Sequence, residues 1–253
     1  MRLVIAVILT VFSLFGYVTA QTAQKSAKVF VLCYHTFHNE KKSQYNFTPD
    51  EFKQHIESIK ALGYHFISMD DFLAGKFDYP LNVMITIDDG NATIKNIYNS
   101  VLKKNGIMPV FFIYPNIIGK KDYALKFDEL VWFKNDGVSF GAHGYFHEYV
   151  NQKLYDLSVQ RFKDEIYKAK DVLEQKLSIP IKVYAYPFGL YSPITIQHMI
   201  IAGYKYAFTI NWGYVQTPID QTKKYEIPRY LVETSSWKSI YETLKKHAVP
   251  KNK

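Results

Sequence analysis

The 253-residue chain contains a single cysteine, Cys33, so no disulfide bond can form within it. An exported chain of this length would therefore be held together by its hydrophobic core alone. Cys33 lies in the apolar run VFVLCYH, which favours a buried, unreactive thiol over a nucleophile. The sequence also lacks internal repeats, low-complexity tracts and long linkers. We therefore expect one domain over residues 21–253.

Long hydrophobic runs are absent after Ala20, and the one run before it is short. Residues 1–20 consist of Met-Arg, an apolar stretch and the small-residue exit Val-Thr-Ala. This run is shorter than the roughly 20 apolar residues that a membrane-spanning helix needs. A signal peptide cleaved after Ala20 is therefore preferred to an uncleaved anchor. We expect the mature protein to be secreted, with a periplasmic or extracellular location.

Dense runs of one charge are also missing. The 31 lysines and arginines outnumber the 23 acidic residues and give a net charge of +8, but they are scattered. This distribution argues against a nucleic-acid partner. It favours peripheral contact with an anionic surface of the cell envelope, although a solvated basic surface is the better explanation for most of the lysines. No obligate protein partner is inferred.

Short β-branched and aromatic runs alternate with longer stretches of helical periodicity, which predicts βα units around a mainly parallel sheet or barrel. The predicted strands cover residues 29–34, 65–68, 82–87, 109–114, 138–142, 182–186, 206–210 and 229–232. The predicted helices cover residues 49–62, 93–105, 127–135, 159–177, 193–202 and 237–246. Thr48 before Pro49 is typical of a helix N-cap.

The first chemically informative segment is VMITIDDGNAT, in which an apolar strand ends in Asp88-Asp89-Gly90. Two adjacent carboxylates repel one another, and the C-terminal edge of a parallel sheet is where active sites form. An ordinary Asp-Gly turn with solvated carboxylates is the alternative.

The second segment is SFGAHGYFHEY, in which His143 and His147 follow a predicted strand. Spacing of four residues on a helical turn would bring both imidazoles to one side, as a divalent metal ion requires. With Asp89 they would form a two-histidine, one-carboxylate site that leaves Asp88 free to act as a base. The charge of the ion would then relieve the repulsion between the two aspartates.

These residues resemble the polysaccharide deacetylases that share the NodB homology domain, also called carbohydrate esterase family 4. The family motif Thr-Phe-Asp-Asp-Gly is similar to Thr86-Ile87-Asp88-Asp89-Gly90, and the His-x-x-x-His motif matches residues 143–147. The resemblance runs through most of the mature chain. It implies a distorted or incomplete TIM-like (β/α) barrel and a divalent metal, with Zn²⁺ as the default and Ni²⁺ or Co²⁺ as alternatives.

A third family motif, Arg-x-Pro-aromatic, resembles Ala185-Tyr186-Pro187-Phe188, with alanine in place of the arginine that orients the catalytic aspartate. Arg229 is a candidate replacement, and an ordinary ion pair at the surface or core edge is the alternative. The resemblance implies that the backbone N–H of Phe188 stabilises the oxyanion, because Pro187 has no N–H. Tyr186 and Pro187 are candidate substrate contacts.

Two further family features are less well matched. Trp212, after the strand at residues 206–210, fits the tryptophan of the acetyl pocket but also fits plain core. The family histidine that acts as general acid has no clear counterpart, since His198 and His247 do not follow strands. His35, at the end of the first strand, remains as an outside candidate for the acid and as a candidate substrate contact.

The resemblance is nearest to the poly-N-acetylglucosamine deacetylases, through Cys33-Tyr34-His35, Tyr186-Pro187-Phe188-Gly189 and Ile227-Pro228-Arg229. It implies a metal-dependent hydrolase that removes N-acetyl groups from poly-N-acetylglucosamine or peptidoglycan. A noncatalytic glycan-binding protein that retains the fold is the alternative from another class, and a metal-binding or structural module is the third.

Overall fold

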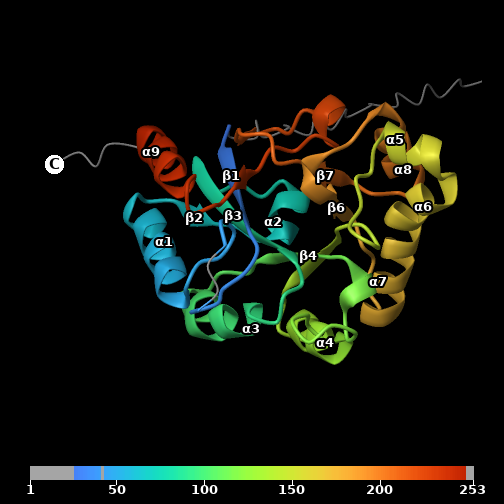
Figure 1. The fold of residues 1–253 in the computed structure, drawn as a ribbon. Coiled ribbons are helices and arrows are strands. Elements are labelled where there is room, and N and C mark those ends of the chain that lie inside the picture. Colours follow the sequence, from blue (N-terminus) through green and yellow to red (C-terminus); the bar gives the residue numbers. More distant parts are fainter. Residues whose placement is uncertain (1–25, 41–42, 249–253) are drawn as a thin grey trace, which may run out of the picture.

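The central element is a curled, mainly parallel sheet with helices around its outside (Figure 1). The computed structural model describes residues 26–40 and 43–248. The predicted signal peptide at residues 1–20 therefore lies outside the described residues. In the part of the chain that is described, no helix has the length and hydrophobicity to cross a membrane.

The strands follow the order β7-β6-β5-β4-β3-β1-β8, with β2 also paired to β3 and β9 to β1. All pairs are parallel except β1 with β8. The strands are β1 Lys28–Tyr34, β2 His65–Phe66, β3 Leu81–Asp89, β4 Val110–Ile113, β5 Ser139–Ala142, β6 Val183–Ala185, β7 Tyr206–Phe208, β8 Val215–Gln216 and β9 Tyr230–Leu231. The expected distorted (β/α) barrel is confirmed. β8 was not predicted, because two residues carry no readable alternation.

The α-helices are α1 Pro49–Ala61, α2 Met69–Ala74, α3 Ile94–Ile97, α4 Phe127–Asn135, α5 Gln152–Leu157, α6 Val159–Lys163, α7 Ala169–Leu177, α8 Pro193–Ile201 and α9 Trp237–His247. The predicted helices at residues 93–105 and 159–177 are present but change hydrogen-bonding pattern, with π-helical turns at Tyr98–Leu102 and Asp164–Lys168. Thr48 caps α1 as predicted, in a reciprocal capping box with Glu51. The six-residue helices α2 and α5 were missed because they are too short to show a period.

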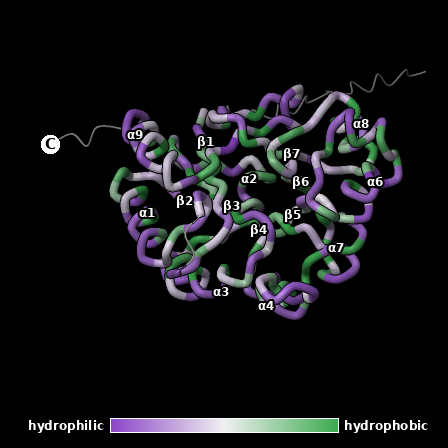
Figure 2. Tube along the Cα trace, viewed as in Figure 1, coloured by the Kyte–Doolittle hydropathy of each residue, from purple (hydrophilic) through white to green (hydrophobic). Residues whose placement is uncertain are grey.

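Alternation along the strands divides the core into two layers. Val31, Met84 and Phe112 face the inside of the curled sheet, where Phe72 of α2 joins the same hydrophobic cluster. Leu32 and Ile85 face the surrounding helices and belong to the larger outer cluster. Figure 2 shows the outer helices alternating between hydrophilic and hydrophobic residues, as helices with one buried face must.

The two edges of the curled sheet are joined by the segment at residues 227–231. Ile227 forms a parallel bridge with Phe208 of β7, and Tyr230 pairs with Leu32 of β1. This segment therefore spans the gap between the first and last parallel strands. Its central residue, Arg229, is fully buried between them.

Candidate active site

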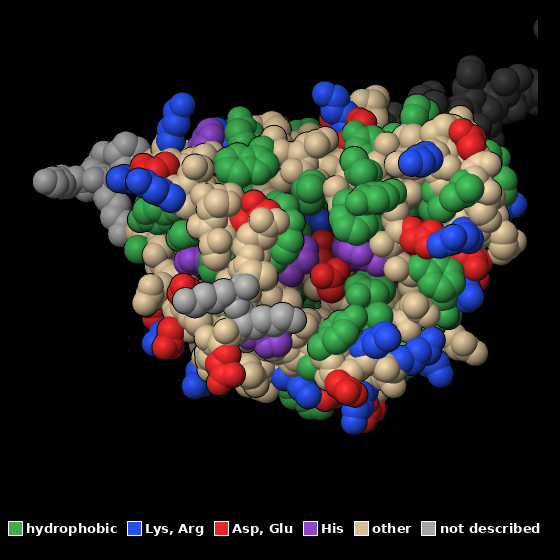
Figure 3. Space-filling model, viewed as in Figure 1, with side chains coloured by type: hydrophobic (Ala, Val, Ile, Leu, Met, Phe, Trp, Pro, Cys, Tyr) green, Lys and Arg blue, Asp and Glu red, His purple; other side chains and the backbone are tan. Residues whose placement is uncertain are grey.

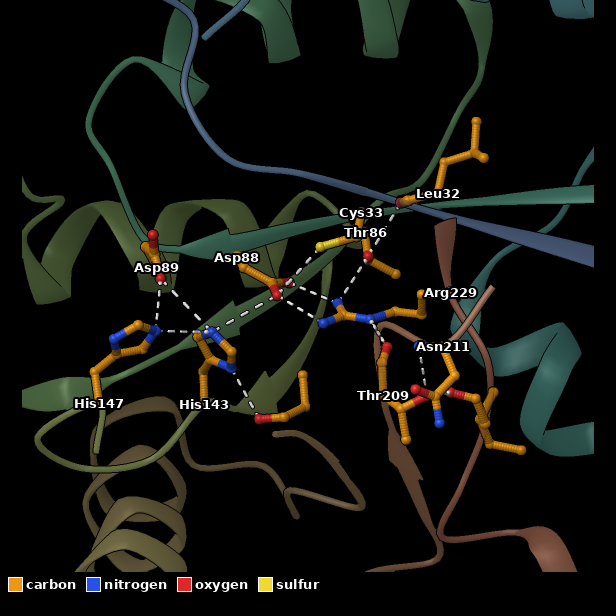
Figure 4. Close-up of polar contacts among 12 residues, drawn as sticks. Leu32, Cys33, Thr86, Asp88, Asp89, His143, His147, Thr209, Asn211 and Arg229 are labelled. Carbon is orange, nitrogen blue, oxygen red and sulfur yellow. Dashed lines mark hydrogen bonds and ion pairs between the residues drawn. The ribbon is translucent and has the colours of Figure 1, made fainter. Parts of the chain in front are cut away.

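Strand β3 ends in two carboxylates at the C-terminal edge of the sheet. Thr86 and Asp88 lie on the same face of the strand as Met84, toward the inside of the sheet. Asp89 then has a φ of +74°, which ends the regular strand. Asp88 and Asp89 consequently both point toward the histidines (Figure 4). The alternative of a solvated Asp-Gly turn does not apply to Asp88, which is only 1% exposed.

The two histidines come from the loop that follows β5, and the expected helical turn is wrong. Residues 143–148 contain no helix, and both Gly144 (φ +76°) and His147 (φ +67°) adopt the left-handed conformation. The loop nevertheless brings the Nε2 atoms of His143 and His147 to 3.2 Å from each other. The four-residue spacing is therefore used, but by a tight loop instead of a helix.

Asp89, His143 and His147 bring three possible ligand atoms together. Asp89 Oδ1 lies 3.6 Å from His143 Nε2 and 3.4 Å from His147 Nε2. Ligands bound to one tetrahedral zinc ion at about 2.1 Å are roughly 3.4 Å from one another. Asp89 Oδ1 is also buried and has no hydrogen-bond partner among the described residues. The geometry and this unsatisfied oxygen both fit a divalent cation.

The protonation of the two imidazoles suits a metal ligand as well. His143 Nδ1 is 2.8 Å from the carbonyl oxygen of Ala185, so Nδ1 carries the proton and donates it there. This leaves the His143 Nε2 lone pair directed at Asp89 and His147. Burial, followed by the neighbouring His143, lowers the pKa of His147 to about 4. His147 is therefore neutral at physiological pH.

Glu165 holds the histidine loop in place. Its side chain is fully buried and accepts hydrogen bonds from the backbone N–H groups of Tyr145, Phe146 and Glu148. A Cβ atom on Gly144 would overlap Glu165 Oε2, and the φ of +76° also favours glycine at this turn. Burial raises the pKa of Glu165 to about 7, against the opposing effect of these hydrogen bonds. The sequence analysis did not find Glu165, because a glutamate within a helical pattern carries no local signal.

Asp88 is bound by Arg229 in a buried, bidentate ion pair (Figure 4). Both N–O distances are 2.8 Å, and both residues are at most 1% exposed. Arg229 also donates to Thr86 Oγ1 and the Thr209 carbonyl. Burial opposes the ionisation of Asp88, but the guanidinium outweighs it and holds the pKa of this carboxyl well below its usual range. Arg229 therefore forms no surface ion pair; its ion pair is buried, and its partner is Asp88.

Cys33 completes the surroundings of Asp88. The thiol donates to Asp88 Oδ2 at 3.4 Å and is fully buried. Burial raises the pKa of Cys33, which keeps the thiol protonated and makes it a poor nucleophile. The sequence correctly predicted a buried, unreactive thiol but not its contact with Asp88.

A cavity of about 300 Å³ opens at these residues. Figure 3 shows the hollow near the centre of this face, where histidine and acidic side chains are surrounded by hydrophobic ones. Tyr45, Ile210 and Leu231 add walls that the sequence analysis missed, because they come from loops and strand ends without a motif. His35 also lines the cavity. A His35 nitrogen, Cys33 Sγ and an Asp88 oxygen all lie within 4.8 Å of one another.

Of the remaining predicted residues, Phe188 and Tyr186 line this cavity, whereas Pro187 and Trp212 do not. Phe188 lines it, and its backbone N–H has no hydrogen bond within the described chain. Tyr186 also lines it, but its ring is fully buried and its hydroxyl donates to the Tyr225 carbonyl. Pro187 is buried beside Gly144. Trp212 is 51% exposed, packs against Tyr230 and is not part of the cavity wall, so the structure does not bring it to the other residues.

Comparison with known proteins decides the family. The model of the polysaccharide deacetylase family matches residues 80–207, which include β3 and the histidine loop. The chain belongs to this family. The resemblance predicted from residues 86–90 and 143–147 is therefore confirmed, and with it membership of a group of hydrolases that act on N-acetyl groups.

Several relatives of this polysaccharide deacetylase carry a more specific name. A poly-β-1,6-N-acetyl-D-glucosamine N-deacetylase of Staphylococcus epidermidis is 28% identical over 209 residues, which cover 78% of this chain and 71% of the relative. The Staphylococcus aureus protein of the same name is 26% identical over 211 residues, with the same coverage. The predicted likeness to this branch is thus confirmed.

Solved structures share the fold of this deacetylase. IcaB from Ammonifex degensii superposes with a TM-score of 0.75 at 23% identity and covers 87% of this chain and 97% of its own. The Streptococcus pyogenes deacetylase PplD, in complex with acetate, gives a TM-score of 0.74 at 23% identity, with coverages of 87% and 99%. At this level of identity the likeness establishes the fold.

Proposed function

We propose that this polysaccharide deacetylase is a metal-dependent enzyme that hydrolyses N-acetyl groups of a polymer containing N-acetylglucosamine. The observation that carries the proposal is the convergence of three ligand atoms, from Asp89, His143 and His147, beside the buried carboxylate of Asp88. Poly-N-acetylglucosamine is the first candidate substrate, because the relatives from Staphylococcus are named for it. Peptidoglycan is the second.

Asp89, His143 and His147 would hold the ion. Zinc suits two imidazoles and one carboxylate, and nickel or cobalt would accept the same set. A divalent ion held there would polarise the acetamide carbonyl and would make a water molecule easier to deprotonate. Asp88 is assigned as the base that takes the proton from this water. Arg229 keeps Asp88 ionised and fixes the direction of its two oxygens.

The oxyanion and the acetyl group are assigned to the cavity wall. The unpaired backbone N–H of Phe188 is a donor for the developing oxyanion, which a preorganised amide stabilises at little reorganisation cost. Ile210 and Leu231 supply apolar surface for the acetyl methyl group. Trp212, assigned to the acetyl pocket from sequence, is replaced in this role by these two residues.

The proton for the leaving amine is assigned to His35. The His35 ring lines the same cavity as His143 and His147, and its Nδ1 is buried without a hydrogen-bond partner in the described chain. A nitrogen of this ring is within 4.8 Å of an Asp88 oxygen. An imidazole in the cavity wall this close to the assigned base is suited to deliver a proton to the leaving amine.

We further propose that the enzyme is a single domain exported by the segment at residues 1–20. One continuous sheet, from Lys28 to Leu231, supports the single domain. The short apolar run with a small-residue exit supports a cleaved signal. Outside the cytoplasm, the net charge of +7 that remains once Arg2 is removed with the signal would favour peripheral contact with an anionic envelope surface.

The decisive experiment measures acetate release by the mature protein from β-1,6-linked N-acetylglucosamine oligomers and from peptidoglycan, with zinc, nickel or cobalt added. Asp88→Asn and His143→Ala are the controls, and we expect release with the wild type and none with either variant. The relative rates on the two glycans rank the substrates. No release with any ion, together with measurable glycan binding, would overturn the proposal in favour of a noncatalytic glycan-binding protein.

A further inference from the structure

A second cavity, of about 320 Å³, adjoins the catalytic cavity. His147 and Phe188 line both cavities, so the two spaces meet at these side chains. The other walls of this flanking cavity come from the start of the loop after His147 and from α5, and they include Tyr149, Lys153 and Leu157. A polymer whose reacting sugar occupies the catalytic cavity can therefore extend directly into the flanking cavity.

The walls of the flanking cavity are unusually apolar for an exposed position. The side chains of Tyr149, Leu157 and Phe188 are 52%, 73% and 47% exposed. The rings of Tyr149 and Phe188 are 4.4 Å apart at an angle of 48° and form a continuous aromatic surface. Exposed apolar surface of this kind marks a binding site. The C–H face of a pyranose ring is a suitable partner for it.

The charged side chains at this cavity are not equally paired. Glu148 lies in the wall, but its carboxylate is paired with Arg161. Lys153 is exposed and has no ion pair within the described chain. The cavity therefore has an unpaired positive charge and no unpaired negative one. A glucosamine unit, whose ammonium group is cationic, would be repelled, whereas a neutral N-acetylglucosamine unit would not.

From these observations we infer that the flanking cavity binds the neighbouring sugar of the polymer and selects the N-acetylated form of it. This inference rests on the proposed deacetylase function and extends it. Its consequence is that one deacetylation disfavours a second at the adjacent unit, so that deacetylated units become spaced along the polymer.

The apolar contact is tested with Leu157→Ala and Tyr149→Ala. The readout is the ratio of kcat/KM for an N-acetylglucosamine tetramer to kcat/KM for a single-unit acetamide substrate. We expect this ratio to fall about fivefold, as loss of apolar contact with a bound sugar ring predicts. Ile201→Ala is the matched control, because Ile201 is 70% exposed on α8 and lies outside both cavities. An unchanged ratio in both test variants would overturn the inference.

The charge selection is tested with two tetramers that differ only in whether one internal unit carries an acetamide or an ammonium group. The wild type should prefer the fully acetylated tetramer about fivefold, Lys153→Gln should lose this preference, and Lys153→Glu should reverse it. Lys238→Glu on α9, which lies at the opposite edge of the molecule from α5 in Figure 1, is the control for net charge. If the wild type and all three variants discriminate equally between the two tetramers, the proposed selection is refuted.

Failure of the function and failure of this inference give different results. If no acetate is released from any substrate, the proposed function fails. Binding of the two tetramers to the same proteins, measured by calorimetry with a chelator present, then still tests the flanking cavity. If acetate is released but neither the Leu157 nor the Lys153 variants change the ratios, only the inference fails.

Discussion

Arg229 and Asp88 are 141 residues apart in sequence, yet their side chains form two hydrogen bonds of 2.8 Å each in the interior of the sheet. The pair exists because the segment at residues 227–231 joins both edges of the curled sheet and places Arg229 behind the end of β3. The same contact makes Asp88 both a structural and a candidate catalytic residue. It leads to the first prediction.

Replacing Arg229 by glutamine should destabilise the fold strongly. The substitution leaves the Asp88 carboxylate buried without a cation, which costs about 3–5 kcal/mol in comparable buried pairs. Urea unfolding measures the change in the free energy of unfolding. Arg161→Gln is the matched control, since its ion pair with Glu148 is 55% exposed on the arginine side and should contribute less than about 1 kcal/mol. Equal losses in the two variants would contradict the prediction.

Glu165→Gln should weaken metal binding without removing a ligand. The carboxylate orders the loop that carries both histidines, and loss of such outer contacts lowers metal affinity by about 10–100-fold. Competition with a chromophoric chelator gives the zinc dissociation constant. Glu174→Gln is the matched control, because Glu174 also accepts a backbone N–H, from Ile181, but lies away from the histidine loop. If both variants keep the wild-type constant, Glu165 does not position the ligands.

A position can require glycine because of its positive φ or because a Cβ atom has no space. Gly144 and Gly203 separate these two requirements, because both have a φ of +76°. A Cβ on Gly203 would meet no heavy atom within 4 Å, whereas a Cβ on Gly144 would overlap Glu165. Gly203→Ala should cost only the backbone strain, about 1–2 kcal/mol. Gly144→Ala should cost roughly 2 kcal/mol more, from steric overlap. Chemical denaturation of both variants measures the difference, and equal costs would show that the overlap is relieved.

His55 should make stability depend on pH. Burial lowers the pKa of His55 from 6.5 to about 3, and the ring stacks on Trp237 at 3.6 Å. Between these values the unfolded chain binds a proton that the folded chain does not. The contribution of neutral His55 to stability is therefore fully present above pH 6.5. Below it, the free energy of unfolding falls by up to about 1.4 kcal/mol per pH unit.

The substitution His55→Phe tests this dependence, because it keeps an aromatic ring beside Trp237 and removes the titrating group. Urea unfolding at pH 7 and pH 5 gives the slope for each protein. We expect a smaller loss of stability on acidification in the variant than in the wild type. Identical slopes would mean that His55 is not the group responsible.

Local sequence patterns determined the family, the βα architecture and most of the candidate metal site. Asp88 and Asp89 were found because two carboxylates ending an apolar strand are unusual, and His143 and His147 because their spacing is. The pattern could not give the shape of the histidine loop. Two left-handed residues, Gly144 and His147, replace the expected helical turn, and the buried Glu165 from a later helical segment stabilises it.

Only the tertiary structure decided which distant residues meet. From the sequence, Arg229 was either the support of Asp88 or an ordinary ion pair, and only closure of the sheet brought it to Asp88. Trp212, which matched the expected place in sequence, lies outside the cavity, and Ile210 and Leu231 line it instead. The physical reason is that a strand sequence encodes which face each side chain occupies. The curvature of the sheet and the path of the closing segment depend on packing over the whole core.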